Sequence, residues 1–232
     1  MKPIAIIGAM REEIEALQAK IEQPQRCTIA GLEIHTGTLY GKPVVMVMSG
    51  IGKVNMAMCT QLLIDRFDVG ALINPGCAGG LGEAKVGDIV ISTQSVERDF
   101  DCSDCGDAVG VIPRMDRSTF IADKRLVELA ANAARELYPE ISVYTAPVTT
   151  GDQFLTDRKY STWLHEHFGA MASEMEGAAM AHVAYLNGDL PYVIIRAISD
   201  TADGDANETY QKHKDAVLRR NVDSVCRGVK EL

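Results

Sequence analysis

The stretch at residues 191–205 reads PYVIIRAISDTADGD and decides the fold class. It contains an apolar, β-branched run that ends abruptly in Arg196, Ser199 and Asp200. A continuous apolar run of this length, bounded by Pro191 and Gly204, predicts a strand buried on both faces. Because ligands of α/β proteins gather where such strands end, its polar end is a candidate binding or catalytic site.

Strands and helices are expected to alternate along the rest of the chain. Apolar runs predict strands at residues 4–9, 32–39, 43–49, 71–74, 88–96 and 141–150. Helical spacing or composition predicts helices at residues 11–22, 53–67, 124–137, 157–168, 176–186 and 209–231. Residues 99–117 lack a regular period and predict a long functional loop. No repeat or low-complexity linker interrupts this order, so we expect one α/β domain over residues 1–232, with a largely parallel central sheet covered by helices.

The composition is that of a soluble globular protein and disfavours several function classes. The chain has 232 residues, of which 47% are hydrophobic and 24% are charged. Its formal net charge of -9 argues against a nucleic-acid partner, which requires a basic face. No stretch approaches the roughly 20 apolar residues of a membrane span, and the N-terminal apolar run is too short for a signal peptide. We therefore expect a cytoplasmic protein with neither a membrane nor a nucleic acid as partner.

The cysteines and histidines are not spaced as metal ligands. Cys102-x-x-Cys105 is the close pair among six scattered cysteines, but a zinc site needs a second pair or histidines at ligand spacing. None follows, and the five histidines show no such spacing with nearby acids. Free thiols in a reducing compartment are expected, with no metal and no cofactor.

Four segments that follow expected strands carry polar or glycine-rich residues: 9–13, 75–80, 151–155 and 199–205. We expect their strands to run in the same direction, so that these segments converge on one edge of the sheet. The glycine-rich segment is consistent with an anion cradle or with a tight turn. It lacks the spacing of a P-loop or of a dinucleotide-binding fingerprint.

Each side chain at these strand ends has a structural interpretation beside a functional one. Glu13 could stabilise the positive N-terminal end of a helix dipole, or it could take part in catalysis. Phe154 could pack in the core or stack on an aromatic ligand. Asp200 could cap a turn or react with a ligand. The carboxylates at residues 174 and 176 precede a buried, alanine-rich segment and need partners, for which Arg196 is a candidate.

Taken together, the segments resemble the 5'-methylthioadenosine/S-adenosylhomocysteine nucleosidase family of the nucleoside phosphorylase-like superfamily. The resemblance covers nearly the whole chain, beginning at IAIIGAMREE (residues 4–13). Its further pieces are SGIGKVN (49–55), GCAGGL (76–81), GDIV (87–90), GDQF (151–154), EMEGAA (174–179) and RAISD (196–200). It implies an α/β fold with a mixed central sheet flanked by helices in three layers, and a homodimer.

The resemblance also implies hydrolysis of the N-glycosidic bond of adenine thionucleosides, releasing adenine and a thioribose. By this likeness Asp200 protonates N7 of adenine so that the base departs neutral, and Glu13 activates the attacking water. Glu176 binds the ribose hydroxyls, and nearby carboxylates stabilise an oxocarbenium-like sugar. The implied substrate-binding residues are Met10, Ile51, Cys77, Ala78, Gly79, Phe154, Leu155, Glu174, Met175, Glu176, Arg196, Ser199 and Tyr210.

The chain departs from the family pattern in the loop at residues 98–114. In relatives this loop is rich in apolar residues and covers the 5' tail of the substrate across the dimer. Here Cys102 and Cys105 stand at those apolar positions, and Pro113 keeps the pattern. The resemblance thus implies a tail pocket that the partner subunit lines with Cys102, Cys105 and Pro113 and that is wider than in relatives. At Cys77 many relatives carry Ser or Val, so a packing role is expected there.

Alternatives to this function stay open from the sequence. Some members of the family take 6-amino-6-deoxyfutalosine as substrate. A phosphorolytic purine nucleoside phosphorylase would need cationic side chains that donate hydrogen bonds to phosphate where this chain has Met10 and Glu13. A non-catalytic nucleoside-binding protein would keep Phe154 and Asp200 but would not need Glu13.

Overall fold

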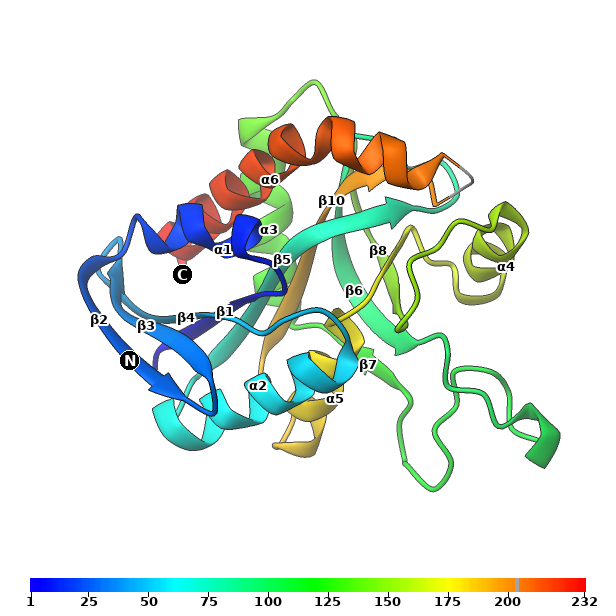
Figure 1. Ribbon diagram of the computed structural model, residues 1–232, viewed down its shortest axis with the longest axis horizontal. Helices are drawn as coiled ribbons and strands as arrows, with labels where there is room; N and C mark the ends of the chain where they lie inside the picture. The colour runs from blue at the N-terminus through cyan, green and yellow to red at the C-terminus, as the bar shows by residue number, and fades with distance from the viewer. Residues whose placement is uncertain (203–204) are drawn as a thin grey trace.

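The computed structural model describes residues 1–202 and 205–232, and it has three layers (Figure 1). Helices α1 (Arg11–Gln18), α3 (Lys124–Leu137) and α6 (Ala206–Glu231) lie on one face of a mixed β-sheet. Helices α2 (Lys53–Phe67) and α5 (Gly177–Leu186) cover the other face, and α4 (Arg158–Phe168) lies to one side. The predicted α/β class with helices on both faces of a mixed sheet is confirmed. Gly204, expected to bound the last strand, lies outside the described residues.

The centre of the sheet is parallel. Strand β1 (Ile4–Gly8) pairs in parallel with β4 (Lys42–Met48) and β5 (Ala71–Gly80), and β5 pairs in parallel with β10 (Tyr192–Asp200). Strand β6 (Ile89–Glu97) is antiparallel to β10 and parallel to β8 (Val143–Thr150). The short β9 (Ala172–Glu174) joins β8 to β5. Strands β2 (Glu22–Ile29) and β3 (Leu32–Leu39) extend the sheet beyond β4, and β7 (Thr119–Ile121) pairs with β6.

The expectation that the strands before all four polar segments run in the same direction is wrong for β8. Strand β8 follows the direction of β6 and is therefore antiparallel to β5 and β10. Its end still reaches the same place, because strands β10, β6, β8, β9 and β5 pair in a closed ring. In that ring Thr149 pairs with Ser173, and Ser173 pairs with Gly79.

The glycine-rich segment at residues 75–80 is not a turn. It belongs to β5, which continues through it to Gly80 and pairs there with β10 and β9. The first helix is shorter than the expected range of residues 11–22, and β2 was not expected. Helix α1 ends at Gln18, and β2 begins at Glu22 as an almost fully exposed edge strand. An exposed, polar strand carries no alternation of apolar residues by which it could be recognised.

The strand over residues 192–200 is buried at every position, as its apolar run predicted. It packs in a large core that includes Ile6, Ile7, Leu72 and Met180. Residues 99–117 form a long loop, as expected, with one 3-10 turn at Ser103–Cys105. Within the described residues, no helix is long and apolar enough to cross a bilayer.

Candidate active site

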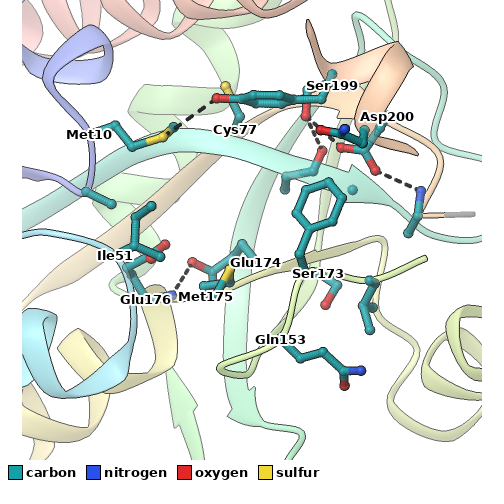
Figure 2. A pocket seen from close by; sticks show the side chains of 18 of the residues that line it. Met10, Ile51, Cys77, Gln153, Ser173, Glu174, Met175, Glu176, Ser199 and Asp200 are labelled. Atoms are coloured by element: carbon teal, nitrogen blue, oxygen red, sulfur yellow. Dashed lines mark hydrogen bonds between the residues drawn. The ribbon is translucent and has the colours of Figure 1, made fainter. Parts of the chain in front are cut away.

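A cavity of about 280 Å³ lies where β1, β5, β9 and β10 end (Figure 2). Of the site residues expected in this chain's own pocket, those that line it are Met10, Glu13, Ile51, Cys77, Ala78, Gly79, Phe154, Leu155, Glu174, Met175, Glu176, Ser199, Asp200 and Tyr210. Arg196 is the exception among them. The lining residues that the sequence analysis missed are Ala9, Gln153, Ser173, Ala202, Asn207 and Gln211. Most of them adjoin a predicted residue in the chain, so adjacency was the available signal.

Glu13 is held by backbone groups at the start of α1. Its Oε2 accepts hydrogen bonds from the N–H groups of Ala9, at 2.8 Å, and Met10, at 3.0 Å. Its Oε1 accepts the N–H of Cys77 at 3.2 Å. Burial raises the pKa of Glu13, and the charge of Arg196 and these hydrogen bonds oppose the rise. A carboxylate with a raised pKa is better suited to take a proton near neutral pH than an exposed one. Its neighbour Glu12 is exposed, in keeping with a simple helix-end charge.

Arg196 is buried and pairs with Glu174, which lines the cavity. Its Nη2 donates to Glu174 Oε2 at 2.5 Å, and both side chains are 1% exposed. Its Nη1 donates to the carbonyl of Asn74 at 2.7 Å. Burial lowers the pKa of Arg196, but the charges of Glu174 and Glu176 outweigh burial and hold it above its usual value. Arg196 therefore supports the cavity wall through Glu174 and does not itself line the cavity.

Glu174 organises the start of α5. Its Oε2 accepts the N–H groups of Glu176, at 3.0 Å, and Gly177, at 2.7 Å, and its Oε1 accepts the hydroxyl of Thr150. These bonds satisfy the first amides of the helix, which have no partner within it. The Glu174 oxygens are thus engaged by protein groups, although the side chain forms part of the cavity wall.

Glu176 faces the cavity from the N-cap position of α5 (Figure 2). Its Oε1 accepts the N–H of Gly52, at the start of α2, at 2.8 Å. Burial, and next the charge of Glu174, raise the pKa of Glu176 to about 8. This carboxylate is therefore close to the balance between its charged and neutral forms at physiological pH.

Asp200 lies across the cavity at the end of β10. Its Oδ1 accepts the N–H of Ala202 at 2.9 Å, so the side chain does cap a turn, as one interpretation held. The hydroxyl of Ser199 lies 2.9 Å from Asp200 Oδ2 and 3.2 Å from the carbonyl of Ala78. Asp200 is buried and also lines the cavity, so the two interpretations do not exclude each other.

The loop after β8 forms another wall. Phe154 is 45% exposed and lines the cavity, so it is not the core residue of the ordinary interpretation. The buried Arg98, which the sequence analysis did not single out, lies behind this loop. Its Nη2 donates to the carbonyl of Gln153 at 2.6 Å, and its Nε donates to Ser173 Oγ at 3.1 Å. Its position directly after the end of β6 was the available signal.

The remaining candidates divide between the cavity and the surface. The hydroxyl of Tyr210, on α6, lies 3.6 Å from Met10 Sδ. Burial, followed by the charge of Glu13, raises the pKa of the Cys77 thiol, which keeps it protonated and favours packing over reactivity. The 3-10 turn with Cys102 and Cys105 projects away from the body of the molecule (Figure 1). Cys102, Cys105 and Pro113 do not line the cavity of their own chain, and their role in a partner's pocket stays a prediction.

No cluster of three or more potential His, Cys, Asp or Glu ligands occurs in the part of the chain that the structure describes. The cavity therefore offers carboxylates, backbone groups and an aromatic face for a ligand. Such a set suits acid–base chemistry on an uncharged organic molecule.

Comparison with known proteins agrees with the fold. The family model of the phosphorylase superfamily matches residues 3–232, so the chain is an α/β protein of that superfamily. A 5'-methylthioadenosine/S-adenosylhomocysteine nucleosidase of Geobacillus sp. (strain WCH70) is 40% identical over 231 residues, which cover 99% of this chain and 98% of the relative. The chain belongs to the 5'-methylthioadenosine/S-adenosylhomocysteine nucleosidase family and is a hydrolase.

Solved structures show the same relationship. The nucleosidase of Neisseria meningitidis in complex with methylthio-immucillin-A has a TM-score of 0.94 and 36% identity, with 100% of both chains covered. Futalosine hydrolase of Helicobacter pylori strain 26695 has a TM-score of 0.92 and 30% identity, with 100% of this chain and 98% of that chain covered.

Proposed function

We propose that residues 1–232 form one nucleosidase domain that hydrolyses 5'-methylthioadenosine and S-adenosylhomocysteine to adenine and a thioribose. The observation that carries the proposal is the convergence of Asp200, Glu13 and Glu176 on one cavity, with Phe154 in its wall. The proposal is supported by the Neisseria meningitidis relative, whose structure holds methylthio-immucillin-A.

Asp200 is the proposed general acid. Adenine is a poor leaving group as an anion, and a proton on N7 lets it depart neutral. A carboxylic acid at the end of β10 can supply that proton while Phe154 stacks on the base and the backbone of Leu155 holds it. Ser199, 2.9 Å from Asp200 Oδ2, would orient the acid.

Glu13 and Glu176 act on the sugar in this proposal. Loss of the base leaves an oxocarbenium-like ribose, which nearby carboxylates stabilise. Glu176 accepts the ribose hydroxyls, and the burial that raises the pKa of Glu13 suits it to take a proton from water. The three backbone N–H groups around Glu13 hold its oxygens in place for that step.

Water is favoured over phosphate as the nucleophile. Among the described residues that line the cavity none is Lys, Arg or His, and the buried Arg196 is engaged by Glu174. Carboxylates in such a cavity repel phosphate. We expect adenine release to be independent of added phosphate, and strict dependence on phosphate would show a phosphorylase instead.

The decisive variant is Asp200→Asn, which is nearly isosteric but cannot donate the same proton. Turnover is expected to fall by about 10²–10⁴-fold, while adenine binding, measured by calorimetry, remains. Undiminished release of adenine by this variant would refute Asp200 as the acid. Exposed Asp189→Asn, at a residue that does not line the cavity, is the control and should leave turnover unchanged.

Aminodeoxyfutalosine is a second candidate substrate, favoured by the likeness to futalosine hydrolase of Helicobacter pylori. A panel of adenosine, methylthioadenosine, S-adenosylhomocysteine and aminodeoxyfutalosine, assayed for free base, separates the candidates. We expect the thionucleosides to react well ahead of adenosine. Equal rates for all four would show that the tail pocket does not discriminate.

A homodimer is proposed as the working form. Exposed apolar side chains lie on α2, with Val54 80% and Met58 41% exposed, and on α5, with Leu186 66% exposed. Such side chains on neighbouring helices are typical of a protein interface. In the dimer, Cys102, Cys105 and Pro113 would line the tail pocket of the partner. Light scattering should give a dimer mass, and Val54→Asp should give a monomer.

A further inference from the structure

Three residues outside the cavity form a closed ring of contacts. Lys53 Nζ lies 2.6 Å from Asp99 Oδ1. Asp99 Oδ2 accepts the backbone N–H of Asp152 at 2.9 Å, and Asp152 Oδ1 accepts the backbone N–H of Lys53 at 2.8 Å. The ring therefore joins the start of α2, the end of β6 and the loop after β8, which are far apart in the chain.

Two of the three residues of the ring, Lys53 and Asp152, are followed or preceded in the chain by residues that contact or line the cavity. Gly52, before Lys53, donates its N–H to Glu176 Oε1 at 2.8 Å. Gln153 and Phe154, after Asp152, form the wall proposed to hold the base. Gly52 has a φ of +97°, which favours glycine, and a Cβ there would lie 3.0 Å from Asp152 Oδ1 and crowd that carboxylate. The ring thus sets the position of the loop wall relative to Glu176.

The charges of the ring favour a persistent contact. The side chains of Lys53 and Asp99 are 19% and 29% exposed, so solvent screens the pair less than a pair at the open surface. Burial lowers the pKa of Lys53, but the hydrogen bonds to Asp99 and Glu97 and the charges of these two carboxylates together outweigh burial and hold the pKa above its usual value. Lys53 also lies 3.3 Å from Glu97 Oε2, and the other oxygen of Glu97 lies 2.8 Å from His182 Nδ1.

We propose that Lys53, Asp99 and Asp152 are positioning residues that fix the base-stacking loop relative to the ribose-binding carboxylate. The inference rests on the proposed function, in which Phe154 holds the base and Glu176 holds the ribose. None of the three lines the cavity, so they act through these neighbours. Asp200 and Glu13 belong to β10 and α1, which are not among the three segments that the ring joins. Breaking the ring should therefore raise KM more than it lowers kcat.

Lys53→Met tests the ring, because it removes the cation but keeps the backbone N–H that Asp152 accepts. Its kcat/KM is expected to fall about tenfold, mainly through KM, as for groups that orient a binding residue. Lys53→Arg keeps the cation and should retain most of the activity. The matched control is Lys2→Met, which breaks the exposed Lys2–Asp68 pair at 2.7 Å and should leave both constants unchanged.

Hydrogen exchange of the loop amides supplies a readout that does not need turnover. The amides of residues 151–155 should exchange faster in Lys53→Met than in the wild type. Their exchange rates in Lys2→Met should equal those of the wild type. Asp99→Asn, which weakens the same pair from the other side, serves if Lys53→Met does not fold. If the wild type is active and the folded variant has the same kcat/KM as the wild type, the inference is overturned and the proposed function stays intact. If the wild type releases no adenine, the proposed function fails. In that case, equal hydrogen-exchange rates of residues 151–155 in Lys53→Met and the wild type would show that the ring does not position the loop.

Discussion

Gly76 lies against the carboxylate of Glu13, because a Cβ added at Gly76 would be 2.9 Å from Glu13 Oε1 and 3.2 Å from Arg196 Nη1. Gly79, further along β5, has the same relation to Asp200, whose Oδ1 would lie 3.0 Å from an added Cβ. The glycines of β5 therefore make room for the two carboxylates proposed to do the chemistry. Because these glycines have no side chain, the side chains of Glu13 and Asp200 can approach the strand closely.

Gly76→Ala is expected to lower kcat by about 10–100-fold, because the new methyl group displaces Glu13 from its backbone donors. Gly76 does not have a positive φ, so the backbone accepts alanine and the effect comes from the contact. The control is Gly228→Ala in α6, where an added Cβ meets nothing within 4 Å. That variant should keep its activity and gain up to about 1 kcal/mol of stability. Wild-type kcat in Gly76→Ala would contradict the steric argument.

Glu13→Gln should lower turnover by about 10²–10⁴-fold, because the amide cannot take a proton from water. Adenine binding, measured by calorimetry, should persist, since Glu13 is proposed to act on the water and not on the base. Glu12→Gln, the exposed neighbour in α1, is the matched control and should behave as the wild type. Full turnover in Glu13→Gln would exclude Glu13 as the base.

Glu176 should couple stability to pH. Burial, and next Glu174, raise its pKa from 4.5 to about 8. Between these values the folded protein holds a proton that the unfolded chain has released. The resulting stabilisation is complete below pH 4.5 and is lost as the pH rises through about 8. In urea denaturation over this window, the free energy of unfolding should fall less steeply with pH for Glu176→Gln. Exposed Glu15→Gln should keep the wild-type slope, and equal slopes for all three proteins would disprove the coupling.

Arg196→Leu should destabilise the protein by about 3–5 kcal/mol, because it leaves Glu174 buried without its charged partner. Chemical denaturation measures this loss. Arg117→Leu breaks an exposed pair with Asp189 of 2.7 Å and should cost no more than about 1 kcal/mol. Similar small losses of unfolding free energy in both variants would show that the Arg196–Glu174 pair does not support the cavity wall.

Elements with strong local periodicity were predicted best from the sequence. Helices α2 and α3 begin and end at the expected residues, because their apolar side chains recur at helical spacing. Strand β10 was recognised from its apolar run. Strand β2 was missed because it is exposed, and the glycines of β5 were assigned to a turn because close approach of distant side chains leaves no local signal.

The sequence by itself determined the α/β class, the family resemblance and the polar residues at the strand ends, since local patterns record which side chains are buried. The tertiary structure decided how those residues meet. It buried Arg196 against Glu174 instead of in the cavity lining, and it brought the end of β8 to the cavity against the expected strand direction. It also closed the ring of Lys53, Asp99 and Asp152. Such contacts join segments distant in the chain, and their geometry depends on how the strands pair, which local spacing does not encode.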